Sequence, residues 1–314
     1  MLVLIGAACT SADDDRREEP PPATEPGPGA GGSTPTPAGG GGGTGDGGDG
    51  DGGAAFESVT VGAWNLEHFP LSAGAVEAVA ALLSTEKPDV IGLEEIDDLG
   101  AFAALDAALP DYEGIYADDP GAYTRVALLY RTARVEVSEV RTLFANDWYA
   151  FPRPPLDARL RVAGARGGTI FEFDFVVVHL KAYGDDESRD RRMKACVKLD
   201  AWIRDQGGAS GHFIVAGDWN DKLTDPPETN VFGPFLGAPD TYRFLTAPLA
   251  EAGAFSYIPY QSLIDHVLVT TTALDEYGAG ETEVLAVEDQ IPGYLDTVSD
   301  HRPVLSHFLV PVGR

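Results

Sequence analysis

Polar side chains of limited chemical variety stand at the ends of several apolar, strand-like segments of the sequence. The positions concerned are Asn65, Glu95, His179, Asp218, Asn220, Asp265, Asp300 and His301. Carboxylate and amide oxygens are the ligands that Mg²⁺, Mn²⁺ and Ca²⁺ prefer, and histidines beside them can take up and release protons. Strand ends of adjacent sheets can converge on one rim. The pattern therefore predicts a divalent-metal site with acid–base groups beside it.

Taken singly, each of these motifs also fits an ordinary structural role. Asn65 is a typical turn residue, and His179 at the end of a buried strand could be structural. The pair Glu94-Glu95 is less ordinary, because side chains alternate along a strand and one of the two acids should point inward. In the run 217–220, the glycine frees the backbone so that the acid and the asparagine can point the same way. The presence of all the motifs together is what indicates a functional site.

The segments that carry the motifs are predicted to be many strands and few helices. Apolar runs predict strands at 58–64, 89–96, 125–131, 135–143, 169–180, 212–216, 264–270, 283–287 and 303–310. Helical spacing of apolar residues predicts helices at 72–85, 101–108 and 188–205. Because the order is mixed, we expect two packed β-sheets flanked by helices, and not a regular βαβ barrel.

The N-terminal part of the chain has a composition that does not support a core. Between Pro20 and Ala55, proline aside, no apolar side chain is larger than alanine, and glycine and proline dominate. Such a segment cannot bury enough surface to offset its chain entropy, so residues 10–54 are predicted to be a disordered tether. Residues 55–314 remain for one domain, a normal length for a two-sheet sandwich.

The first nine residues resemble the end of a bacterial lipoprotein signal, in which the cysteine is lipidated. Cys9 follows the apolar stretch 1–8, although Gly6 stands where leucine is usual and no basic residues precede the stretch. Eight residues are too few to span a bilayer. We expect an extracytoplasmic protein, either secreted or anchored to the cell envelope through this lipid alone, with an ordinary N-terminus as the alternative. Cys196 then has no obvious disulfide partner, and no obligate protein partner is evident.

The charge of the chain bears on its substrate. The formal net charge is -28, and residues 1–53 hold nine of the 50 acids and two of the 22 bases, which leaves 41 acids against 20 bases in the rest. Bulk electrostatics therefore opposes binding to nucleic acid and to anionic membranes. A polyanionic substrate would need metal ions or a local basic patch.

The motifs in their order resemble the signature of the endonuclease/exonuclease/phosphatase superfamily. The residues that carry the resemblance are Asn65, Glu95, His179-Leu180-Lys181, Gly217-Asp218-Trp219-Asn220, Asp265 and Ser299-Asp300-His301. The superfamily includes pancreatic-type deoxyribonucleases, apurinic endonucleases, inositol polyphosphate phosphatases and sphingomyelinases. The match spans residues 58 to about 310. It implies an α/β fold, a four-layer α-β-β-α sandwich of two mixed β-sheets, and metal-dependent hydrolysis of phosphoesters.

The resemblance also implies which residues hold the metal. Asn65 and Glu95 would bind the divalent cation, Mg²⁺ or else Mn²⁺ or Ca²⁺, with Asp300 contributing directly or through water. The cation would neutralise the charge that develops on the phosphate in the transition state.

Proton transfer and positioning fall to five other residues under the same resemblance. His301, paired with Asp265, would take a proton from the attacking water. Asp218 and Asn220 would position that water and the phosphate. His179 would stabilise the phosphate oxygens or protonate the leaving group.

The sequence departs from the superfamily at two positions. Glu94 stands where glutamine commonly precedes the metal-binding glutamate, which predicts extra negative charge and tighter metal binding. Thr124 stands where pancreatic-type nucleases have a glutamate that pairs with the first histidine, so we expect His179 to lack a carboxylate partner. The run Arg153-Pro-Pro-Leu156 resembles a segment of the nuclease-like members.

A local excess of basic residues lies between 181 and 198. Six bases (Lys181, Arg189, Arg191, Arg192, Lys194 and Lys198) stand among four acids. Lys181 and Arg192 are the candidates for contact with substrate phosphates. The alternative is a solvated helix face with charge pairs four residues apart, and no aromatic stacking platform is evident beside it.

These features order the functional hypotheses. Asn220 is followed by Asp221-Lys222, where inositol phosphatases carry Asn-Tyr-Arg, and no exposed apolar hairpin of the sphingomyelinase kind is evident, although Ala254–Tyr260 is apolar and aromatic. An extracytoplasmic endonuclease is the first hypothesis. A phosphatase or phosphodiesterase acting on a small-molecule or lipid phosphoester is the second, and an inactive binding module is the third, although no motif residue is missing.

Overall fold

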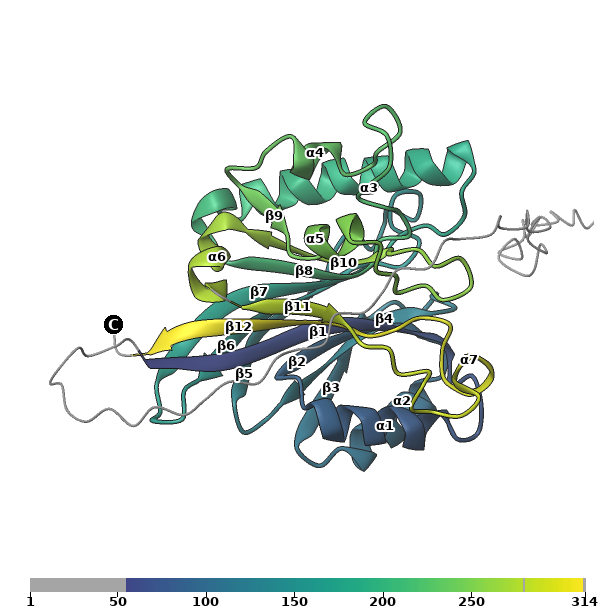
Figure 1. Ribbon diagram of the computed structural model, residues 1–314, viewed down its shortest axis with the longest axis vertical. Helices are drawn as coiled ribbons and strands as arrows, with labels where there is room; N and C mark the ends of the chain where they lie inside the picture. Colours follow the sequence, from purple (N-terminus) through teal and green to yellow (C-terminus); the bar gives the residue numbers. More distant parts are fainter. Residues whose placement is uncertain (1–54, 279, 313–314) are drawn as a thin grey trace, which may run out of the picture. The chain divides into compact units, whose positions relative to one another are not determined.

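Two six-stranded β-sheets lie face to face in the computed structural model, which describes residues 55–278 and 280–312 (Figure 1). The predictions for the Cys9 anchor and the tether lie outside the described residues. The first sheet has the order β11 (Glu281–Val284), β12 (Val304–Val312), β1 (Ala55–Phe69), β2 (Val90–Ile96), β4 (Arg125–Arg131), β3 (Tyr112–Tyr116). The second has the order β5 (Val135–Thr142), β6 (Leu156–Ala163), β7 (Thr169–His179), β8 (Phe213–Asp218), β10 (Asp265–Thr270), β9 (Tyr242–Phe244).

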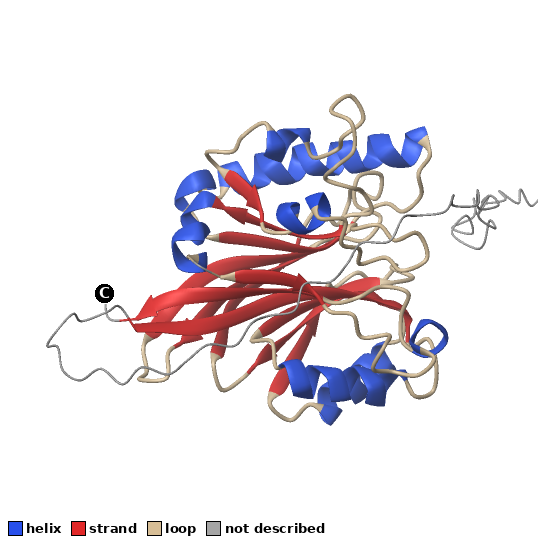
Figure 2. Ribbon diagram, in the orientation of Figure 1, coloured by secondary structure: helices blue, strands red, loops and turns tan. Residues whose placement is uncertain are grey.

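Helices cover the outer faces of both sheets, as Figure 2 shows. The helices are α1 (Ala75–Glu86), α2 (Leu99–Ala108), α3 (Asp186–Asp205), α4 (Gly233–Leu236), α5 (Ala247–Glu251), α6 (Thr271–Tyr277) and α7 (Tyr294–Thr297). Each sheet contains one parallel strand pair joined through a helix, β1-α1-β2 in the first and β7-α3-β8 in the second. The other pairs are antiparallel. The predicted sandwich of two mixed sheets with helices outside is confirmed.

Apolar side chains fill three layers, because strands buried on both faces place alternate residues on each side of a sheet. The inner layer lies between the sheets and includes Val61, Leu128 and Phe175. The first outer layer packs α1 and α2 against one sheet, and the second packs α3 and α4 against the other. Gly92 marks how closely the sheets approach, since a Cβ atom there would lie 2.9 Å from a methyl group of Val177.

The structure adds elements that the sequence pattern did not predict. Strands β3, β6 and β9 were not predicted, and β6 pairs with β7 along its length. Strand β6 alternates apolar residues with Asp157, Arg159 and Arg161, whose charges are compensated by partners on neighbouring strands. The strand predicted at 283–287 is observed at Glu281–Val284. The chain turns at Leu285, and Val287 therefore packs in the first outer layer instead of continuing the strand.

Two further observations concern Cys196 and membranes. The Cys196 thiol is free and buried in the second outer layer. Its burial raises the pKa of the thiol, so it is unreactive in the folded protein. Across residues 55–278 and 280–312, the helices are all too short or too polar to span a membrane.

Candidate active site

The register of three neighbouring strands brings three of the predicted site residues side by side. His179 ends β7 opposite Asp218 at the end of β8, and Asp265 at the start of β10 also lies opposite Asp218. Gly217 makes this arrangement possible: its φ is 145°, and a Cβ atom there would lie 2.0 Å from the carbonyl oxygen of Val178. Only glycine fits such a close approach of two backbones. The Gly-Asp motif is therefore a requirement of the strand pairing.

The first sheet supplies the other half of the site. Asn65 on β1 lies beside Glu94 on β2. The Asn65 Nδ2 group donates to Glu95 Oε1 at 3.1 Å and, across the gap between the sheets, to Asp218 Oδ2 at 3.0 Å. The site is therefore built where corresponding ends of both sheets meet.

His301 and Asp265 form a hydrogen-bonded pair in this site. The Nδ1–H group of His301 donates to Asp265 Oδ2 at 2.8 Å, and the Ser256 hydroxyl donates to the same oxygen. The other ring nitrogen, Nε2, lies 3.9 Å from Asp218 Oδ2 and 3.7 Å from Asp300 Oδ1. Because Asp265 orients the ring, Nε2 is the nitrogen that faces the centre of the site.

Packing between distant segments fixes the Ser-Asp-His motif. The Ser299 hydroxyl donates to the Asn65 carbonyl oxygen at 2.6 Å and accepts from the His301 amide at 2.9 Å. The Trp64 indole donates to the His301 carbonyl oxygen at 3.2 Å. These bonds tie His301, which lies just before β12, to the end of β1.

Burial and mutual charge set the protonation of this group. Burial opposes the charge on His301, but the negative charges of Asp265, Asp218 and Asp300 outweigh it and raise the pKa of His301 well above its ordinary value. Burial, followed by the nearby charge of Asp265, raises the pKa of Asp218 to about 7. Both shifts show that the charged groups are held together away from bulk water.

Among the described residues, the metal-ligand side chains whose donor atoms all lie within 4.8 Å of one another are Asp218, Asp265 and His301. A looser acidic cluster lies beside them. It consists of Glu95, Asp300 and Glu67. Of these three, Glu67 was not predicted from the sequence. Burial and then the charges of Asp300 and Glu95 raise the pKa of Glu67 to about 7. Among the described residues nothing hydrogen-bonds the buried Glu67 Oε2. Mutually repelling carboxylates with an orphaned oxygen are the donor set that Mg²⁺, Mn²⁺ or Ca²⁺ would satisfy.

The backbone at the end of β1 turns Glu67 toward this cluster. Glu67 and His68 have φ angles of 42° and 52°, in a region that non-glycine residues rarely adopt. The amide of Glu67 donates to Asn65 Oδ1 at 3.0 Å, and the amide of His68 donates to Glu95 Oε2 at 3.0 Å. The sequence does show that an acid, Glu67, follows two positions after Asn65. It does not show the turn that directs this acid toward the cluster.

Asn65 and Asn220 both hold other site groups in place. The Asn65 amide nitrogen orients Glu95 and Asp218, while its oxygen already accepts one hydrogen bond and has one further lone pair for a cation. Asn220, with a φ of 54°, donates from its backbone to Asp218 Oδ1 at 2.8 Å and from its side chain to the Leu180 carbonyl oxygen at 3.1 Å. It fixes the orientation of Asp218.

His179 is buried within the site. Its Nε2 atom lies 3.6 Å from Asp218 Oδ2 and 3.8 Å from Glu95 Oε1, which is beyond hydrogen-bonding distance, and Nδ1 has no hydrogen-bond partner among the described residues. Burial, together with the charge of Arg153, lowers the pKa of His179 well below its ordinary value. His179 is therefore neutral. Thr124 is buried directly before β4, and no partner in the described chain bonds its hydroxyl.

The expectation that Glu94 adds negative charge to the metal site is wrong. Its side chain is 0% exposed, and neither carboxyl oxygen has a hydrogen-bond partner within the described ranges. Burial, followed by the charges of Asp265 and Asp218, raises the pKa of Glu94 well above its ordinary value. The group is a neutral acid in this arrangement, so it adds little negative charge to the site.

The basic residues of α3 are largely compensated, which differs from the expected phosphate-binding surface. Three bases pair with acids: the half-buried Arg189 with Asp186, and the exposed Lys194 and Lys198 with Asp190 and Asp147. Lys181 lies in the loop after β7, with its Nζ atom 4.6 Å from the centre of the Tyr183 ring. The alternative of a helix face stabilised by charge pairs describes most of this segment.

Arg192 does not offer its charge to a substrate, because it is only 3% exposed. Its Nε group donates to Asp221 Oδ2 at 2.9 Å, and Nη1 donates to the carbonyl oxygens of Lys181 and Tyr183, both at 2.7 Å. It thereby links α3 to the loops that follow β7 and β8. We correct its predicted role from substrate contact to support of these two loops.

Replacing Arg192 by alanine is expected to lower the free energy of unfolding by about 3–5 kcal/mol, because Asp221 would remain buried without its partner. Chemical denaturation measures this loss. Lys194→Ala, which breaks a pair on the exposed face of the same helix, serves as the control and should change stability by less than about 1 kcal/mol. A raised KM with unchanged stability in the Arg192 variant would instead restore the substrate-contact role.

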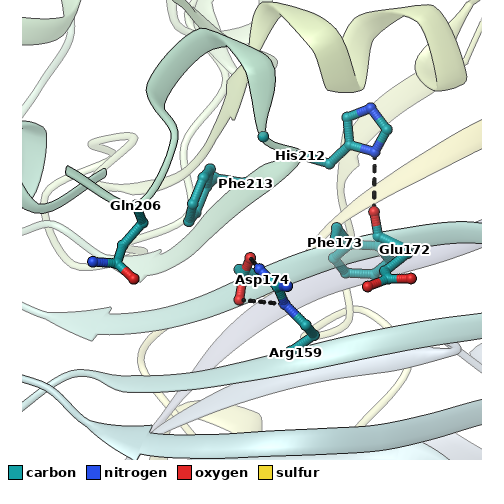
Figure 3. A pocket seen from close by; sticks show the side chains of 8 residues that line it. Arg159, Glu172, Phe173, Asp174, Gln206, His212 and Phe213 are labelled. Atoms are coloured by element: carbon teal, nitrogen blue, oxygen red, sulfur yellow. Dashed lines mark hydrogen bonds and ion pairs between the residues drawn. The ribbon is translucent and has the colours of Figure 1, made fainter. Parts of the chain in front are cut away.

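A shallow cavity of about 230 Å³ lies away from these residues (Figure 3). Its lining includes Phe213, at the end of β8 opposite to Asp218, and Asp174, which pairs with Phe213 from the middle of β7. Arg159 and Asp174 in its wall form an ion pair at 2.6 Å, and His212 bonds the Glu172 carbonyl oxygen. These polar groups already bond one another or the backbone, so this cavity is not a second candidate for the active site.

Comparisons with known proteins agree with this geometry. The model of the Endonuclease/Exonuclease/phosphatase family matches residues 62–301. No curated protein matches the sequence. A family protein from Bacteroides thetaiotaomicron shares the fold with a TM-score of 0.59 and 17% identity, over 82% of this chain and 100% of that one.

Two other solved structures share the fold at similarly low identity. TDP2 from D. rerio complexed with a single strand DNA product has a TM-score of 0.60 and 17% identity, over 80% of this chain and 98% of that one. A mannosyl-6-phosphatase from Bacteroides thetaiotaomicron has a TM-score of 0.58 and 18% identity, over 80% and 99%. Together with the motif residues gathered at one end of both sheets, the family match shows that this chain belongs to the endonuclease/exonuclease/phosphatase family of divalent-metal-dependent phosphoester hydrolases.

Proposed function

We propose that the protein hydrolyses phosphodiester bonds as an extracytoplasmic endonuclease that uses a divalent cation, with Mg²⁺ as the first candidate. The observation that carries the proposal is the His301–Asp265 pair, whose bond of 2.8 Å leaves His301 Nε2 facing Asp218 and Asp300. A histidine oriented by a buried acid beside a cluster of hard oxygen donors is suited to activating water against a phosphate.

The residues divide the chemistry between them. A cation bound beside Asp218 and Asp300 would offset the negative charges that raise the pKa of His301. The neutral ring then takes the proton of the attacking water through Nε2, and Asp265 keeps the ring in the required tautomer. Asp218, held by Asn65 and Asn220, accepts a hydrogen bond from that water and fixes its direction. His179 is neutral, so it acts as a hydrogen-bond donor toward the phosphate or the leaving oxygen.

The acidic cluster would hold the cation. Glu95, Asp300 and Glu67 supply carboxylate oxygens, and Asn65 orients Glu95 and retains one lone pair. When bound there, the cation neutralises charge that develops on the phosphate oxygens. The protein contributes the position of these ligands, which lie on the same rim as the proton-accepting histidine.

The charge around the site favours a diester over a monoester. Carboxyl groups dominate the described side chains there, including Glu67, Glu95, Asp218, Asp265 and Asp300. A phosphomonoester is largely a dianion at neutral pH because its second pKa is about 6. A diester carries a single negative charge and is repelled less.

The extracytoplasmic location rests on the N-terminal sequence alone. Cys9 follows an apolar stretch, and a glycine- and proline-rich segment follows it. A tether of this composition between a lipidated cysteine and a catalytic domain would let the domain act away from the membrane surface. Metabolic labelling with a palmitate analogue, compared between the wild type and Cys9→Ala, tests this part of the proposal.

A plasmid-nicking assay with Mg²⁺, Mn²⁺ or Ca²⁺ tests the reaction, with hydrolysis of bis-p-nitrophenyl phosphate and of p-nitrophenyl phosphate measured in parallel. We expect nicking and diester hydrolysis by the wild type and neither by His301→Ala. Hydrolysis of the diester without nicking would shift the substrate to a small or lipid phosphodiester. Preference for the monoester would contradict the proposal and indicate a phosphatase.

A further inference from the structure

A turn beside the proposed catalytic pair carries two tyrosines. Tyr257 and Ser262 bond each other through both backbone amides, at 2.9 and 3.2 Å, and so close the turn that contains Tyr260. The Ile258 amide donates to the Asp300 carbonyl oxygen at 2.9 Å. The turn is therefore fixed to the segment that carries His301, and it also contributes Ser256, which bonds Asp265.

The two tyrosine rings extend from the catalytic histidine toward solvent. The Tyr257 ring lies against the His301 ring, with 4.9 Å between their centres and 39° between their planes. The Tyr260 ring stacks on Tyr257, with 5.7 Å between centres and 27° between planes. Tyr260 is nevertheless 58% exposed. The two ring contacts, His301 with Tyr257 and Tyr257 with Tyr260, therefore connect the proposed general base to a solvent-exposed aromatic ring.

Core packing does not account for the position of Tyr260. It belongs to none of the three apolar layers, and its ring leaves more than half of its surface in water. The backbone bonds fix the turn, and the stack on Tyr257 restricts the Tyr260 ring, so a ligand that stacked on it would lose little entropy by ordering the protein. An ordered, exposed aromatic ring beside a catalytic group is suited to binding a flat apolar group of the substrate.

The charge of the protein makes such a subsite useful. The chain carries a net charge of -28. Arg189, Lys194 and Lys198 of α3 are paired with acids, and Arg191 bonds backbone carbonyl oxygens and lies over the rings of Trp148 and Tyr149, so attraction to phosphates outside the catalytic centre is weak. Stacking of a base on an aromatic ring needs no positive charge and tolerates any base. One sugar separates a nucleobase from its phosphate. A phosphate at His301 would thus bring an adjacent base within reach of the Tyr260 ring.

We propose that Tyr257 and Tyr260 form a stacking subsite for a nucleobase next to the scissile phosphate, so that nucleic acid with accessible bases is bound more tightly than nucleic acid with paired bases. This inference rests on the proposed function, since it presupposes that His301 acts on a phosphodiester. Tyr260 contacts the base, and Tyr257 supports the Tyr260 ring from beneath.

The experiment compares a short oligothymidylate with the same sugar–phosphate chain without bases, using full-length protein and Mg²⁺. The wild type should cleave the oligothymidylate with a lower KM. Tyr260→Ala should raise that KM by roughly 5- to 100-fold, which corresponds to the loss of one stacked base, and leave kcat unchanged. It should leave the KM for the abasic strand unchanged. Tyr260→Trp should retain the preference for the base-bearing strand.

Phe56→Ala serves as the control, because Phe56 is also an exposed aromatic residue but lies at the start of β1, far along the strand from Asn65. It should change neither KM. Equal cleavage of both strands by the wild type, or an equal effect of Tyr260→Ala on both, would overturn the stacking subsite while leaving the proposed function intact. Cleavage of neither strand would overturn the proposed function and the subsite with it.

Discussion

Replacing His301 by alanine is expected to lower kcat for phosphodiester hydrolysis by about 10²- to 10⁴-fold, the range typical of losing a general base. The reason is geometric: His301 Nε2 is the ring nitrogen that faces Asp218 and Asp300, while Nδ1 is bound to Asp265. Steady-state hydrolysis of bis-p-nitrophenyl phosphate measures the loss. KM should change much less than kcat, because the group acts in the transition state.

Asp265→Asn should reduce kcat to a similar degree without unfolding the protein. An asparagine of the same shape has no negative charge to stabilise the protonated ring, and its amide can reverse the tautomer of His301. The control is His307→Ala, since His307 also bonds an acid, Glu283 at 3.0 Å, but lies on β12 away from the site. Equal losses in the His307 and His301 variants would show that the effect is structural and would refute the assignment of the base.

Removing the divalent cation is expected to abolish hydrolysis. Glu95→Gln should weaken cation binding by at least about 10- to 100-fold, because removing a group that only orients a metal ligand already has an effect of this size. Isothermal titration with Mn²⁺ or Mg²⁺ measures the affinity. The chelated wild type should recover its activity when the cation is restored.

Stability gives a second readout of the same prediction. A cation at about 100 times its dissociation constant stabilises the folded protein by about 2.7 kcal/mol. The Glu95 variant should lose about half of this gain if its affinity falls 10-fold and most of it if its affinity falls 100-fold. Without cation, the variant should be at least as stable as the wild type, because the charge of Glu95 disfavours the ionised form of Glu67. Glu136→Gln, on the edge strand β5, should behave like the wild type. An unchanged affinity in Glu95→Gln would remove Glu95 from the cation site.

The sequence predicted the chemical groups of the site more fully than their arrangement. All eight predicted catalytic and metal-binding residues lie at one rim, from Asn65 on β1 to His301 before β12. They were identifiable because each is a polar group at or next to one end of a predicted apolar strand, a pattern that local periodicity reveals. The sandwich of two mixed sheets followed from the same pattern. Strand β6 was missed although apolar and charged residues alternate along it, so its period was present in the sequence.

The tertiary structure decided which groups act together. Glu67 joins the acidic cluster because the backbone reverses at Glu67 and His68, and such a reversal is not evident in the residue types. Arg192 looked like a surface base, yet the loops after β7 and β8 close over it. Local sequence reports the period and polarity of a segment, whereas burial depends on what other segments cover it.

The same reason explains the two pairings on which the function depends. The pairing of Asp265 with His301 was expected from the family resemblance, because the residues around Asp265 do not themselves specify which group its carboxylate meets. Nothing around Tyr260 indicates that it stacks on a ring that contacts that histidine. The sequence by itself determined the kinds of catalytic group, the strands that end in them and the class of reaction. The register between strands and the packing of the two sheets determined which acid orients the base, which carboxylates can share a cation and which aromatic face is open to a substrate, because those contacts join residues far apart along the chain.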